Sequence, residues 1–123
     1  MITYSFNTKS NLLYVTFDEI ITFAEIIDYL NEFRELDNLP LDLKLFYDVR
    51  KANFDFKLED VATISKHAEL VTEKYNTVKT VFLVDKPKHT ALSQVFTETE
   101  TKEKTTRKYF STEEAAIKWL DSE

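Results

Sequence analysis

The chain has 123 residues, carries a net charge of −6, and contains neither glycine nor cysteine. The lack of glycine excludes the P-loop, the dinucleotide-binding fingerprint, the nucleophile elbow and the EF-hand turn, which all depend on it. The lack of cysteine excludes disulfides and zinc–thiolate sites, and we expect no metal or other cofactor. A chain of this length is expected to form one domain over residues 1–123, with a core of its own.

Acidic side chains are concentrated in residues 18–37, which hold seven acids and one base. Such a segment is usually a solvated helix face, and the alternative is a surface that attracts a basic protein. No basic face stands out, so we expect no nucleic-acid partner. The first residues lack the basic region of a signal peptide and no apolar run reaches 18 residues. We therefore expect a cytoplasmic protein without a transmembrane segment.

The first third of the chain predicts a hairpin and a helix. Apolar and polar residues alternate on either side of residues 7–11, which favours a β-hairpin whose turn uses asparagine in place of glycine. Thr22 and Glu25 match a capping box, and apolar residues at helical spacing follow them. We expect a helix over 22–36 that cannot continue past Pro40.

The middle of the chain alternates strands and helices. Apolar runs over 43–49 and 78–84 predict two buried strands. A helix is expected between them over 58–74, with Asp55 as the best candidate for its N-cap. Pro87 fits the first turn of a third helix. The residues of that helix expected to face inward are Ala91, Leu92, Val95 and Phe96.

The last part of the chain begins with ten residues, 97–106, that have no apolar side chain and predict a frayed helix end and a loop. A strand is expected over 107–110, followed by a helix whose capping box is Ser111 and Glu114. The order β-β-α-β-α-β-α-β-α predicts an α/β domain. Its sheet is mixed, mostly parallel and five-stranded, and about four helices flank it.

Three segments resemble the SpoIIAA-like proteins, small relatives of the STAS (anti-sigma-factor antagonist) domains. They are FYDVRKANF at 46–54, VFLVDKP at 81–87, and RKYF at 107–110 with Glu114-Ala115 and Trp119-Leu120. The resemblance extends over nearly the whole chain. It implies a mixed sheet flanked by helices and a function in binding or regulation.

The STAS antagonists carry a serine, just after an aspartate at the start of a helix, that a partner kinase phosphorylates. The matching segment here is Asp55-Phe56-Lys57, which has phenylalanine and lysine in place of the serine. The resemblance therefore implies a module without the phosphorylation switch. The wider superfamily also resembles the lipid-binding lobe of Sec14-like proteins, which suggests an apolar ligand.

Polar residues follow the two predicted central strands, where ligands of open α/β sheets bind. They are Asp48, Arg50, Lys51 and Asn53 after the first strand, and Asp85, Lys86, Lys88 and His89 after the second. We favour structural roles: Asp48 holding its turn, Asp85 capping the third helix, and solvated lysines. The alternatives are binding of a small ligand or partner, and acid–base catalysis by Asp48 and Asp85.

Three functions remain open from the sequence. We favour a non-enzymatic binding or regulatory module, with a homodimer left open. The alternative is a carrier or sensor of a small lipophilic ligand, which requires an apolar cavity of about 300 Å³ or more. A hydrolase using Asp48 and Asp85 is favoured least. His67 is expected to be partly buried, and the tyrosines to be checked first for exposure are Tyr14, Tyr29 and Tyr109.

Overall fold

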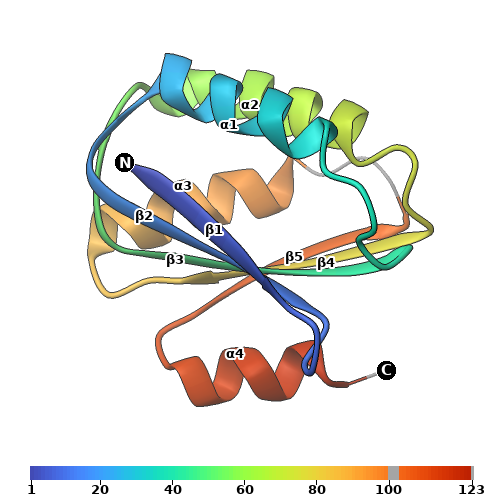
Figure 1. The fold of residues 1–123 in the computed structure, drawn as a ribbon. Coiled ribbons are helices and arrows are strands. Elements are labelled where there is room, and N and C mark those ends of the chain that lie inside the picture. The colour runs from blue at the N-terminus through green and yellow to red at the C-terminus, as the bar shows by residue number, and fades with distance from the viewer. Residues whose placement is uncertain (100–102, 123) are drawn as a thin grey trace.

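The chain folds as a five-stranded sheet with helices on both faces (Figure 1). The structure is a computed structural model that describes residues 1–99 and 103–122. Its elements are β1 (Ile2–Asn7), β2 (Leu12–Thr22), α1 (Phe23–Arg34), β3 (Asp42–Asp55), α2 (Leu58–Val71), β4 (Thr77–Leu83), α3 (Pro87–Glu98), β5 (Thr105–Phe110) and α4 (Glu113–Leu120). This order confirms the predicted α/β class.

The order of strands in the sheet follows the chain, β1-β2-β3-β4-β5. β1 pairs antiparallel with β2, and the other three pairs are parallel, as predicted. Each parallel crossover steps to the next strand in the same direction, so α1, α2 and α3 lie on one face of the sheet. α4 turns back and covers the other face (Figure 1).

Each face of the sheet has its own apolar core. The larger core lies between the sheet and the three crossover helices, and it includes Phe17, Leu30, Val61 and Leu92. The smaller core lies under α4 and consists of Leu12, Phe46, Val81, Leu83, Ala116 and Leu120. The strands are buried on both faces where these cores overlap, which explains the continuous apolar runs of the central strands.

The β1–β2 turn uses asparagine in place of glycine, as predicted. Asn11 adopts the left-handed conformation with φ 57°, which asparagine tolerates better than most residues. The side-chain oxygen of Asn7 accepts hydrogen bonds from the backbone N–H groups of Lys9 and Ser10, at 2.9 and 3.2 Å. These bonds close the turn without a residue that lacks Cβ.

α1 begins as its sequence predicts and ends two residues earlier. The Thr22 hydroxyl accepts a hydrogen bond from the backbone N–H of Glu25, at 3.2 Å. The carboxylate of Glu25 lies 3.2 Å from the amino group of Met1, the residue before the edge strand β1. The expected capping box is thus confirmed on the threonine side, and the glutamate makes an ion pair with the N-terminus.

β3 is much longer than the predicted strand over 43–49, and the difference has a clear cause. A bulge opposite Phe17 inserts one extra residue into β3, between the pairs Thr16–Asp48 and Asp18–Lys51. The extra residue reverses the alternation, so the positions that face the larger core are odd-numbered up to Val49 and even-numbered after it. The strand can therefore keep one face on the core for all 14 residues.

The predicted N-cap of the second helix is wrong. Asp55 is the last residue of β3 and pairs with Thr22, so it lies too far from the helix to cap it. The N-cap is Lys57, whose backbone N–H donates to the carboxylate of Asp60 at 3.0 Å. An acid inside the first turn thus takes the place of the expected cap, where it also meets the positive end of the helix dipole.

α3 starts at Pro87, as predicted, but the segment after it differs from the expected loop. Ala91 is exposed rather than inward, whereas Leu92 is buried. Within residues 97–106, α3 continues to Glu98, β5 already starts at Thr105, and residues 100–102 lie outside the described part of the chain. β5 starts early because its register continues two residues further along β4, where Thr105 pairs with Val78.

The last helix is capped one residue later than predicted. The N-cap of α4 is Thr112, whose hydroxyl accepts from the backbone N–H of Ala115 at 3.3 Å. Ser111 precedes it and is exposed. The capping-box pattern favours Ser111, which has Glu114 three residues later where Thr112 has Ala115, and the structure uses the adjacent hydroxyl instead.

Candidate functional site

The predicted strand-end residues do not form one loop site, because β3 continues past its neighbour. β4 ends at Leu83, which pairs with Asp48, and no strand among the described residues pairs with the remainder of β3 on that side. Arg50, Lys51 and Asn53 therefore lie inside a strand and not in a loop beyond it. The expectation of a shared loop after the strand is wrong for these three residues.

The first turn of α3 takes the place of the missing strand. Three side chains from this turn donate to backbone carbonyls on the open side of β3. The contacts are Lys86 Nζ to Arg50 O at 3.0 Å, His89 Nε2 to Ala52 O at 2.7 Å, and Lys88 Nζ to Phe54 O at 2.8 Å. These carbonyls belong to alternate residues, which point to the same side of a strand. The cations and the imidazole thus satisfy backbone acceptors.

Asp48 holds Arg50, its neighbour on the same strand. The carboxylate accepts from the Arg50 backbone N–H at 3.1 Å and from the guanidinium at 3.0 and 2.8 Å. Partial burial acts to raise the pKa of Asp48, but the hydrogen bonds from Arg50 outweigh it and hold that pKa below its ordinary value. An aspartate stabilised as the anion in this way is poorly suited to act as a general acid.

The remaining two predicted residues, Asn53 and Asp85, are both exposed. Asn53 is exposed on β3, paired with Ile20 of β2. Asp85 is exposed and, with Lys86, lines an open groove of about 500 Å³ beside the start of α3. The N-cap of α3 is Lys86, so the predicted capping role of Asp85 is wrong.

His89 is the most buried of the predicted residues, with 2% of its surface exposed. Its ring packs edge-on against Phe54, with centroids 5.4 Å apart. Since the Ala52 carbonyl can only accept, the Nε2 atom carries a proton, and the buried Nδ1 atom has no partner within residues 1–99 and 103–122. Burial lowers the pKa of His89, which favours the neutral ring.

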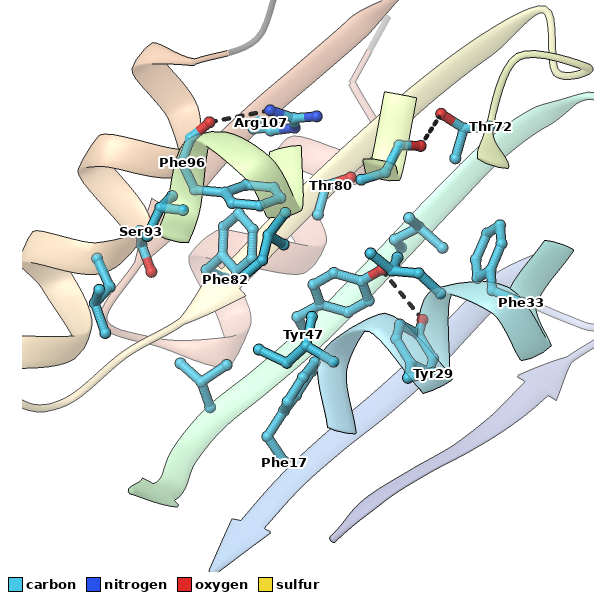
Figure 2. A pocket seen from close by; sticks show the side chains of 18 of the residues that line it. Phe17, Tyr29, Phe33, Tyr47, Thr72, Thr80, Phe82, Ser93, Phe96 and Arg107 are labelled. Atoms are coloured by element: carbon cyan, nitrogen blue, oxygen red, sulfur yellow. Dashed lines mark hydrogen bonds between the residues drawn. The ribbon is translucent and has the colours of Figure 1, made fainter. Parts of the chain in front are cut away.

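A cavity that the sequence did not locate lies between the sheet and the three crossover helices (Figure 2). Its volume is about 90 Å³. It is bordered by β2, β3, β4 and β5 on one side and by α1, α2 and α3 on the other, so it crosses most of the sheet. The volume falls well short of the 300 Å³ or more that a carrier of drug-sized lipophilic molecules requires.

Two tyrosines from different elements meet at the wall of this cavity. The hydroxyls of Tyr29 on α1 and Tyr47 on β3 are 3.1 Å apart (Figure 2). Burial raises the pKa of Tyr47 to about 12 and that of Tyr29 well above its ordinary value. Of the three tyrosines to be checked for exposure, Tyr29 is buried, Tyr14 is half-buried and Tyr109 is 37% exposed.

Arg107 of β5 is a buried cation at the opposite end of the cavity. Its Nη1 atom donates to Ser65 Oγ at 2.5 Å and to the Phe96 carbonyl at 3.0 Å. The Glu69 carboxylate lies 4.0 Å from its Nη2 atom, and the guanidinium lies 4.3 Å from the Phe96 ring centre. Nothing in the sequence distinguishes Arg107 from its exposed neighbour Lys108, because its burial comes from helices packed over the strand.

The described residues hold neither a metal cluster nor a membrane-spanning helix. No group of three or more His, Cys, Asp or Glu side chains there could hold a metal ion. None of the helices in those same residues is long and apolar enough to cross a membrane. His67, the second histidine, is half-buried as predicted and contacts Asn31 Oδ1 through its Nε2 atom at 2.9 Å.

Comparison with known proteins identifies the fold. No protein-family model matches the chain, and no curated protein does so either. Among solved structures, the chain is similar to an uncharacterised protein of the DUF3478 family with a SpoIIAA-like fold, from Shewanella loihica PV-4. The two superpose with a TM-score of 0.61 over 98% of this chain and 92% of the other, at 12% sequence identity. At this identity the likeness establishes architecture alone: the chain has a SpoIIAA-like fold.

Proposed function

We propose that this chain is a non-enzymatic binding module that acts in regulation by docking a basic protein partner on the outer face of α1, without a phosphorylation switch. The observation that carries the proposal is an acidic stripe on that helix, formed by Asp28, Glu32 and Glu35. All three side chains are exposed. Their spacing of four and three residues puts them on one line along the helix.

The acidic stripe is unfavourable for the isolated fold. Like charges three or four residues apart destabilise a helix by a few tenths of a kcal/mol per pair. None of the three carboxylates makes an ion pair within residues 1–99 and 103–122, and the carboxylate of Glu32 accepts a hydrogen bond there from the Tyr4 hydroxyl alone. A lysine- or arginine-rich surface placed over α1 relieves this repulsion and is attracted from a distance.

Two of the groups suited to chemistry, Asp48 and His89, support a non-enzymatic role, because each has a structural partner. Asp48 is held by Arg50, and the imidazole of His89 is held by the backbone of β3. The segment that corresponds to the STAS phosphorylation site is also structural. The ring of Phe56 packs against that of Phe54, with ring centroids 5.4 Å apart, and Lys57 is the N-cap of α2.

The test is charge-dependent capture of a partner from cell extract with the immobilised chain as bait. Asp28→Lys with Glu35→Lys reverses two charges on the acidic stripe, and Glu73→Lys with Glu103→Lys reverses two exposed acids elsewhere. We expect a basic protein to be retained by the wild type and by the control, to be lost with the stripe variant, and to be released by about 0.5 M salt, where charges are strongly screened. Equal capture by both variants, or no specific protein, overturns the proposal.

A further inference from the structure

The cavity beneath α1, α2 and α3 has features of a small-molecule site that is separate from the acidic stripe. We propose that it binds a small neutral molecule with an apolar body and one oxygen acceptor, of the class of three-carbon ketones and alcohols. This inference goes beyond the proposed function, because it concerns the inner side of the helical layer and needs no protein partner.

The wall of the cavity selects for an apolar body. Aromatic rings from β2, β3, β4 and α3 surround it, with Phe17, Tyr47, Phe82 and Phe96 in successive contact (Figure 2). Beside these rings a water has no hydrogen-bond partner, and a buried water needs two to four of them. An apolar molecule restores the dispersion contacts that the lining atoms lack.

Three residues of the wall, Thr80, Ser93 and Thr105, carry buried hydroxyls. Thr105 is 4% exposed and lines the cavity, and its hydroxyl has no partner within residues 1–99 and 103–122. Thr80 and Ser93 add two buried hydroxyls to the wall, and neither is joined by a hydrogen bond to another labelled residue there (Figure 2). A buried hydroxyl without a partner is costly, so a ligand oxygen that accepts from it is favoured.

The charge balance of the wall favours a neutral ligand. Arg107 is the cation that lines the cavity, and its guanidinium already contacts Ser65, the Phe96 carbonyl and, at 4.0 Å, the Glu69 carboxylate. An anionic ligand would add a second negative charge beside Glu69 in a site of low dielectric, which is unfavourable. The carboxylic acids of similar size are therefore excluded from the proposed class.

The volume of the cavity limits the size of the ligand and the affinity with which it binds. An engineered cavity of about 150 Å³ accepts benzene, with six non-hydrogen atoms, so by proportion the present 90 Å³ accepts about four. Acetone and 2-propanol have this size. The best small ligands gain about 1.5 kcal/mol per non-hydrogen atom, so the dissociation constant is no tighter than about 40 µM.

Methyl and amide NMR titrations with three probes of four non-hydrogen atoms each test the proposal. Acetone and 2-propanol are expected to shift the methyl signals of Val78 and Leu92, which line the cavity, in a saturable manner, and ethylene glycol is not expected to do so. Shifts that are linear up to about 100 mM, or equal for all three probes, overturn the proposal. A crystal structure with ordered waters alone in the cavity, in the presence of acetone, overturns it as well.

Two matched variants test the donor. Thr105→Val keeps the shape of the side chain and removes the hydroxyl, so it is expected to weaken acetone binding by about 2- to 13-fold. Thr106→Val is the control, because Thr106 is the next residue of β5 and is exposed. Unchanged affinity in Thr105→Val assigns no role to the hydroxyl and overturns the oxygen-acceptor part. The acidic-stripe variants leave α1's inner face intact, so failure of partner capture does not affect this result.

Discussion

Filling the cavity is expected to stabilise the protein, and a pair of identical substitutions measures the effect. Val78 on β4 lines the cavity, whereas Val15 on β2 is buried in the same core and does not. Both are in strands and are 2% and 1% exposed. Val→Ile adds one methylene at either position with the same change in strand propensity. The difference between the two variants therefore reports the free space next to each side chain.

The expected magnitudes follow from the cavity volume. A void costs about 24 cal/mol per Å³, so the 90 Å³ cavity costs the fold about 2 kcal/mol. One buried methylene is worth about 0.8 kcal/mol, and Val78→Ile is therefore expected to raise the free energy of unfolding by about 0.5–1 kcal/mol. Val15→Ile has no space to enter and is expected to lower it by about 1–3 kcal/mol.

Urea unfolding followed by circular dichroism provides the measurement. With a slope of about 2 kcal/mol per molar urea, Val78→Ile is expected to raise the midpoint by about 0.25–0.5 M, and Val15→Ile to lower it by about 0.5–1.5 M. Equal destabilisation by both substitutions would refute the reasoning, because it would mean that Val78 is as tightly packed as Val15. A change in slope would indicate an altered unfolded state instead.

Three further predictions concern buried polar groups and a helix cap. Burial holds the pKa of His89 below its usual 6.5, so the unfolded chain binds that proton more readily than the folded one. The free energy of unfolding is therefore expected to fall as pH drops below about 6.5, in wild type and in His67→Leu, and His89→Leu is expected to lose the part of this fall that comes from His89. Urea midpoints from pH 5 to 8 provide the measurement. In a spectrophotometric titration, Tyr29 and Tyr47 are expected to ionise at higher pH than the exposed tyrosines. Tyr47→Phe is expected to remove one of the groups that ionise at high pH. Ionisation of all tyrosines at the pH of the exposed ones contradicts the buried pair. Thr22→Ala is expected to cost about 1 kcal/mol of stability and Thr22→Ser to restore it, and equal midpoints for both variants contradict the cap.

The element order was predictable because its signals are local. Thr22 is close in sequence to the N–H group that it caps, and Pro87 starts α3 through its own ring geometry. Asn11 occupies the left-handed position of the first turn for the same kind of reason. The boundaries that failed depend on neighbours in space: β5 starts at Thr105 because β4 is there to pair with it.

The polar residues singled out in the sequence make backbone contacts that the sequence did not predict. The polar residues after the apolar run of β3 do meet those at the start of α3, through Lys86, Lys88 and His89. They meet because β3 extends beyond the end of β4, so that its backbone carbonyls lack strand partners there. Buried carbonyls need hydrogen-bond donors, and these residues supply them. The alternating burial of residues 51–55 was a signal of the longer strand, hidden by the change of parity at the bulge.

By itself the sequence determined the α/β class, the order of the elements, the asparagine turn and the exclusion of glycine-dependent catalytic loops. These follow from side-chain periodicity, caps and backbone conformation, each acting over a few residues. The tertiary structure alone decided the cavity, the Tyr29–Tyr47 pair and the burial of Arg107. Each of these depends on how side chains from separate elements fill a common space, and the 90 Å³ cavity is the small volume that this packing leaves empty.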